Sequence, residues 1–124
     1  MTSRTVTTVV EAPRDDVFDY LANVENLPDW ATEFARELRR DGETWKVVNG
    51  LGEFGIEYRV DRDTGVIDMV VEGAVFPTRV VGLDDERTAF TFTMFRWPGQ
   101  PAELFESQYA SLRREFANIE RRFA

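Results

Sequence analysis

The sequence predicts an α+β fold in which a curved antiparallel sheet of about six or seven strands wraps around a long C-terminal helix, with two short helices after the first strand. Three observations carry this prediction. Apolar and polar residues alternate at the two-residue period of strands through most of residues 33–97. Residues 101–124 instead carry one apolar stripe at helical spacing. A β-branched segment and a proline-led helical segment precede both.

The length and composition are those of a single folded domain, expected to span residues 1–124. Hydrophobic residues make up 43% of the chain, so a core can form. No apolar run follows Arg4, and no stretch approaches 18 consecutive apolar residues, so we expect neither a signal peptide nor membrane insertion. The expected location is cytoplasmic.

The first elements are a strand and a helix. Residues 4–10 are β-branched and alternate, which predicts a strand. Pro13 suits a first helical turn, and the acidic residues 15–16 complement the N-terminal helix dipole. Pro28 disfavours helix at the residue before it, so the first helix breaks there and a short second helix follows at about residues 28–31.

Turn signals divide the alternating region into the strands of one meander. Asp41-Gly42 and Asn49-Gly50 predict hairpin turns, and residues 61–65 and 84–86 predict two more. Pro77 lies near the start of one strand, which indicates an edge or a bulge. The expected strands cover residues 33–38, 45–47, 53–60, 66–72, 76–83 and 89–94.

The last element is a helix that opens at Pro101. Its apolar stripe fits packing on the sheet better than a coiled coil, because it spans fewer than three heptads. A helix lying in a curled sheet touches it along a line, so space for a small molecule can remain between them. The stripe consists of Phe105, Tyr109, Leu112, Phe116, Ile119 and Phe123.

Two segments near the N-terminus carry a resemblance to a known family. The resemblance is carried by residues 9–21 (VVEAPRDDVFDYL) and 23–30 (NVENLPDW), and by the C-terminal helix that follows residues 96–99 (RWPG). The chain resembles the helix-grip, START-like superfamily (SRPBCC) over essentially its whole length. The pattern is typical of small bacterial polyketide cyclase/dehydrase-like members. The resemblance implies a helix-grip fold and a small hydrophobic or aromatic molecule as partner. The superfamily includes enzymes, carriers and regulators.

The absent residue types exclude several kinds of chemistry. The chain contains no Cys and no His, which excludes disulfides, thiolate nucleophiles, imidazole acids or bases and serine triads. We expect no metal and no cofactor. The net charge of −8 argues against nucleic-acid binding.

The remaining polar candidates are two tyrosines and an arginine. Strand parity places Tyr58 and Arg96 on the inner face of the sheet, and Tyr109 lies on the helix stripe. The tyrosines could hydrogen-bond a carbonyl or phenol, and Arg96 could stabilise an enolate or hold a carboxylate. The face of Arg79 stays unassigned, because neither parity around it is clearly apolar. The expected pocket walls are Trp30, Phe54, Ile56, Tyr58, Met69, Phe90, Phe92, Met94, Tyr109, Leu112 and Phe116.

Three functions fit these observations. The first is enclosure of a small, mostly apolar molecule, with cyclisation, aromatisation or dehydration of a polyketide-like substrate if the protein is an enzyme. The second is a non-catalytic carrier of a lipid or aromatic metabolite. The third is a packed interaction module without a ligand, including a homodimer through a sheet edge or the helix. A polar cluster inside a cavity favours the enzyme, and a purely apolar cavity favours the carrier.

Overall fold

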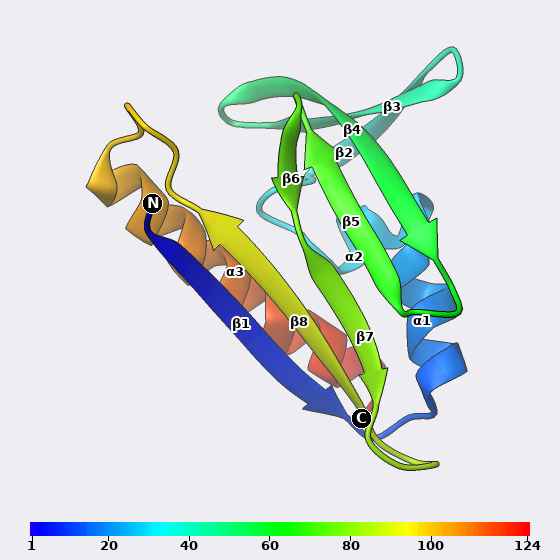
Figure 1. Ribbon diagram of the computed structural model, residues 1–124. Helices are drawn as coiled ribbons and strands as arrows, with labels where there is room; N and C mark the ends of the chain where they lie inside the picture. Colours follow the sequence, from blue (N-terminus) through cyan, green and yellow to red (C-terminus); the bar gives the residue numbers. More distant parts are fainter.

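The computed structural model describes residues 1–124 as one eight-stranded antiparallel sheet with helices on one side (Figure 1). The strand order is β1-β8-β7-β5-β4-β3-β2, and the short β6 pairs with β5. The helical elements are α1 (Arg14–Ala22), the 3₁₀ turn η1 (Val24–Asn26), α2 (Leu27–Trp30) and α3 (Ala102–Arg122). The strands are β1 (Ser3–Val10), β2 (Glu37–Asp41), β3 (Thr44–Asn49), β4 (Gly52–Asp61), β5 (Val66–Val71), β6 (Ala74–Phe76), β7 (Thr78–Gly82) and β8 (Thr88–Phe95).

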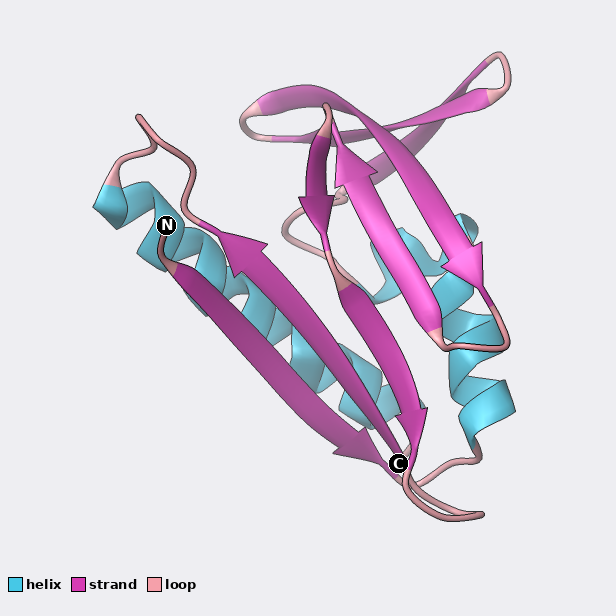
Figure 2. Cartoon of the chain, viewed as in Figure 1, coloured by secondary structure: helices cyan, strands magenta, loops and turns pink.

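The long helix α3 runs along β1 and β8 on the inner side of the curved sheet (Figure 2). Helices α1 and α2 cover the same side, where α1 contacts β7 and α2 contacts α3. This arrangement confirms the predicted wrap of sheet around helix. None of the helices, α3 included, combines the length and the apolar character that crossing a membrane requires.

The strand expected over residues 76–83 is divided at Pro77 into β6 and β7. Proline has no N–H to donate to a ladder, so pairing is interrupted at this residue. Its carbonyl still accepts a hydrogen bond of 2.9 Å from the N–H of Thr93. The division raises the strand count to eight.

Residues 33–36 form a loop where the alternating pattern predicts the start of a strand; β2 begins only at Glu37. The loop's backbone finds side-chain partners in place of a strand ladder. The N–H groups of Glu33 and Phe34 donate to Glu115 of α3, and the carbonyl of Phe34 accepts from Asn49 at 2.7 Å. The loop is thereby held between α3 and the β3–β4 turn.

An aromatic cluster fills the core beside the C-terminal half of α3. Phe90 and Phe116 stack with ring centroids 5.3 Å apart, and Trp30 meets both rings edge-on at about 6 Å. Trp30 and Phe90 are fully buried, and Phe116 is 2% exposed. Offset and edge-to-face rings at these distances attract one another beyond their buried area. This end of the molecule is therefore solidly packed.

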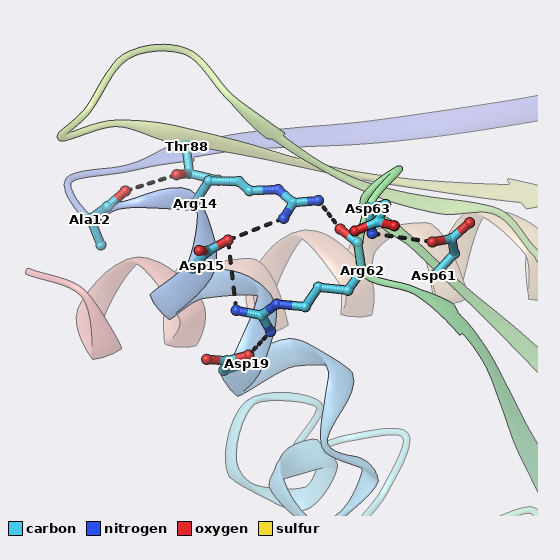
Figure 3. Close-up of polar contacts among 8 residues, drawn as sticks. All are labelled: Ala12, Arg14, Asp15, Asp19, Asp61, Arg62, Asp63 and Thr88. Carbon is cyan, nitrogen blue, oxygen red and sulfur yellow. Dashed lines mark hydrogen bonds and ion pairs between the residues drawn. The ribbon is translucent and has the colours of Figure 1, made fainter.

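Polar contacts attach α1 and the residues just before it to the β4–β5 turn and to the start of β8 (Figure 3). The guanidinium of Arg14 donates to the carbonyl of Arg62 in the β4–β5 turn, and Arg62 in turn donates to Asp19 of α1. The buried Thr88 hydroxyl donates to the carbonyl of Ala12 at 2.8 Å. These contacts set the position of α1 against the sheet.

Candidate functional site

A cavity of about 490 Å³ lies between the sheet, the first half of α3 and the loop at residues 33–36. Its volume is in the range of small-molecule sites. Most of the wall is apolar, and its innermost part is built from α2, the sheet and α3. The buried lining residues here are Leu27, Trp30, Ala31, Met69, Phe92, Met94 and Leu112.

The cavity opens to solvent between the β3–β4 turn and the N-terminal half of α3. Leu51 on the turn is 71% exposed, and Leu104 on the helix is 38% exposed. Exposed polar residues share this mouth with the two leucines. They are Arg36, Ser107 and Gln108.

A single buried carboxyl group, that of Glu115, lines the apolar interior. Glu115 is only 3% exposed, and its Oε2 accepts hydrogen bonds from the N–H groups of Glu33 at 3.1 Å and Phe34 at 3.0 Å. Burial raises the pKa of Glu115 to about 7, because desolvation of the charged form outweighs the two hydrogen bonds that favour it. Both protonation states are therefore populated near neutral pH, and the group can donate or accept a proton.

A second carboxylate on the cavity wall, Glu33, is paired within the protein. Arg114 donates to it through Nε at 3.0 Å and Nη2 at 2.7 Å, and the Ser111 hydroxyl donates at 3.1 Å. The bonds from Arg114 hold the pKa of Glu33 below its usual range. Glu33 is therefore ionised, and Arg114 balances its charge. Glu115, in contrast, has no cationic hydrogen-bond partner.

The structure brings five of the expected pocket residues to the cavity. Trp30, Met69, Phe92, Met94 and Leu112 all contribute to its lining.

The other expected apolar wall residues lie elsewhere on the inner side of the sheet. Phe90 and Phe116 belong to the aromatic cluster, so their rings pack against each other where the sequence predicts pocket walls. Phe54 and Ile56 pack against the core on β4, outside the cavity lining. Correct strand parity places a side chain on the inner face, but it does not place that side chain beside an empty space.

The three polar candidates do not converge. The hydroxyl of Tyr58 is buried without a hydrogen-bond partner, outside the cavity lining, and burial raises its pKa. The ring of Tyr109 lies beneath the guanidinium of Arg4, 4.9 Å from the ring centroid, on the side of α3 that contacts β1. Arg96 is exposed, and its Nε donates to the carbonyl of Gln100 at 3.0 Å. None of the three faces the cavity.

The face of Arg79 is settled by its partner. Its Nη1 forms an ion pair of 2.6 Å with Asp68, while the flanking residues Thr78 and Val80 are buried. Arg79 therefore lies on the outer face of the sheet.

Glu115 is not among the site residues predicted from the sequence, where it directly follows Arg113 and Arg114. A signal was present, because Glu115 follows Leu112 by three residues and precedes Ile119 by four, in one helical row. The part of α3 that lines the cavity combines Leu112 of the apolar stripe with the face beside it. That face carries Leu104, Ser107, Gln108, Ser111 and Glu115.

Comparison with known proteins relates the chain to solved structures of one fold. No protein-family model matches the chain, and no curated protein matches it in sequence. The protein XoxI from Bacillus cereus superimposes with a TM-score of 0.82 at 12% identity, covering 99% of this chain and 96% of that one. The ZhuI aromatase/cyclase from Streptomyces sp. R1128 gives a TM-score of 0.66 at 22% identity over 97% and 89% of the two chains.

A START superfamily protein from Mycobacterium smegmatis also gives a TM-score of 0.66, at 12% identity over 98% and 96% of the two chains. These likenesses cover nearly the whole of each chain and concern the arrangement of the backbone. They agree with the helix-grip fold that the N-terminal segments, with their Ala-Pro and Asn-Leu-Pro-x-Trp motifs, predict. The chain therefore has the helix-grip fold, which it shares with this START superfamily protein and with the ZhuI aromatase/cyclase.

Proposed function

We propose that the protein binds a small, mostly apolar molecule in the cavity between sheet and α3, with the Glu115 carboxyl in contact with a polar group of that molecule. The observation that carries the proposal is the combination of an apolar cavity of about 490 Å³ with one buried carboxyl in its wall. Such a cavity takes up the apolar surface of a ligand, while a few polar groups set its orientation. The fold shared with an aromatase/cyclase and a START protein supports the proposal.

Binding can be tested with N-phenyl-1-naphthylamine, an uncharged aromatic probe whose fluorescence rises in apolar surroundings. We expect saturable binding to the wild type and at least a tenfold loss in Leu112→Trp, because the larger side chain fills the cavity. Ser107→Trp narrows the mouth from an exposed position and should also weaken binding. Leu83→Trp, on the exposed β7–β8 turn, is the matched control.

Unchanged probe affinity in both cavity variants, with native circular dichroism, would overturn the proposal. Absence of saturable binding to the wild type would overturn it too, and would favour a packed interaction module.

A second candidate function is acid–base catalysis, favoured by the Glu115 pKa of about 7. A group that titrates near the working pH serves best as both base and acid. Such a carboxylate removes a proton α to a carbonyl of a polyketide-like substrate. As the acid, it then donates that proton to the β-hydroxyl of the substrate. The β-carbon–oxygen bond breaks, water leaves, a carbon–carbon double bond forms, and Glu115 is again a carboxylate.

The catalytic hypothesis can be tested with an aromatic β-hydroxyketone, by following the ultraviolet absorbance of its conjugated dehydration product. Glu115→Gln should lower the rate at least about 100-fold, the usual contribution of a general acid–base, while keeping probe binding. Glu120→Gln, on the exposed side of α3, should keep the wild-type rate. Equal rates for wild type and Glu115→Gln would overturn the catalytic hypothesis and leave binding as the proposed function. Tyr58→Phe and Arg96→Ala should keep the wild-type rate, because neither side chain faces the cavity.

A further inference from the structure

Arg36 differs from every other basic residue of the chain. The other fourteen of the 15 lysines and arginines each have an ion pair, a hydrogen bond or an aromatic ring against the cationic group. Arg36 has none of these, although acidic residues outnumber basic ones, 23 to 15. Because no acidic side chain of the protein pairs with Arg36, its guanidinium is available to bind an anionic group of a ligand.

The position of Arg36 connects this charge to the cavity. Arg36 is the last residue of the loop that Glu115 holds, and it is an exposed part of the cavity lining. Its guanidinium lies over the β3–β4 turn, where a Cβ built on Gly50 would be 3.5 Å from Nη1. The apolar side chains of Leu51 and Leu104 line the same mouth.

Neither carboxylate of the cavity forms an ion pair with Arg36. The positive charge of Arg36 contributes to the lowered pKa of Glu33, but the hydrogen bonds to the two oxygens of Glu33 come from Arg114 and Ser111. Glu115 is buried and accepts from the loop backbone. The mouth therefore presents one free guanidinium ahead of an apolar interior.

We propose that the ligand of this cavity is an amphipathic monocarboxylate, with its carboxylate on Arg36 at the mouth and its mostly apolar body inside, where a polar group contacts Glu115. The inference rests on the proposed function, since it requires the cavity to be a binding site. A guanidinium offers paired N–H donors that match the two oxygens of a carboxylate. One unpaired arginine balances one negative charge, which favours a monocarboxylate over a doubly charged phosphate in a chain of net charge −8.

The test uses two ligands that share an apolar body, 1-naphthaleneacetate and the uncharged 1-naphthaleneacetamide, in isothermal titration calorimetry at pH 7.5. We expect the wild type to bind the acid about fivefold more tightly than the amide, a preference typical of a partly exposed charged contact. Arg36→Gln should remove the preference by weakening the acid alone. Arg40→Gln, whose guanidinium lies over Trp45, is the control and should keep it.

The outcomes separate this inference from the function on which it rests. Equal affinity for acid and amide in the wild type overturns the monocarboxylate assignment and leaves cavity binding intact. A preference that survives in Arg36→Gln also overturns it, because another group must then hold the carboxylate. Failure of both ligands and of N-phenyl-1-naphthylamine to bind overturns the proposed function together with this inference.

Discussion

At the scale of single residues, the Glu115 carboxyl gives the protein a pH dependence that its composition would not suggest. The pKa of this group is raised from 4.5 to about 7 in the fold, so between these values the folded state binds more protons than the unfolded state. The free energy of unfolding therefore falls as pH rises from about 4.5 to about 7, by about 3 kcal/mol, and is level above. The chain has no histidine to titrate in the same range.

Glu115→Gln removes this dependence. The uncharged amide needs no proton to remain buried, and its oxygen can still accept from the N–H groups of Glu33 and Phe34. We expect the free energy of unfolding to rise by about 1–3 kcal/mol at pH 8 and to change little at pH 4.5. Urea unfolding at the two pH values measures this. A variant that loses stability equally at both would show that the carboxyl acts only as a hydrogen-bond acceptor.

Tyr58 carries a buried hydroxyl with no partner. An unsatisfied buried polar group costs about 1–3 kcal/mol, so Tyr58→Phe should raise the free energy of unfolding by about 1 kcal/mol. The control is Tyr109→Phe, whose residue is partly exposed and whose substitution should change stability by less than about 0.5 kcal/mol. Destabilisation of Tyr58→Phe in urea titrations would mean that the hydroxyl has a partner in solution.

At the scale of elements, the β4–β5 turn shows how closely the backbone packs where α1 meets the sheet. Gly65 has a φ of 76°, and its carbonyl accepts from the N–H of Val80 at 2.8 Å. A Cβ at this position would overlap the carbonyl oxygen of Val80. The guanidinium of Arg14 lies against the same turn, so a shift of the turn would also disturb α1.

Gly65→Ala should therefore lower the free energy of unfolding by more than about 2 kcal/mol. Gly73→Ala is the matched control, because Gly73 has a φ of 83° and no atom near its Cβ position. That variant should lose only the conformational part, about 1 kcal/mol. Urea midpoints compare the two, and equal losses would show that the turn yields without disturbing β7.

At the scale of the whole molecule, the interior divides into a packed end and a hollow end. Phe116 is surrounded by aromatic rings, whereas Met94 borders the cavity on one side. Removing a side chain from a packed site costs the lost burial and the new void, but a side chain beside an existing space has fewer neighbours to lose.

Phe116→Ala should accordingly cost about 3–5 kcal/mol, and Met94→Ala about 1–2 kcal/mol. Both residues are nearly fully buried, so exposure does not explain the difference. Denaturant unfolding without ligand is the measurement. Equal costs would indicate that the cavity collapses in solution.

The class of fold and the inward-facing residues follow from local patterns in the sequence. Alternation in β4 and the row from Phe105 to Ile119 require one buried face on each element, and Pro77 and the glycine turns limit the strands. The packing of elements against one another was needed to show that Phe90 and Phe116 fill the core, that Glu115 lines a cavity, and that Arg36 lies at its mouth without an ion pair. Periodicity gives the direction of a side chain from its own backbone. Whether facing side chains meet or leave space depends on the distance and angle between elements, which the side-chain volumes of the whole chain set together.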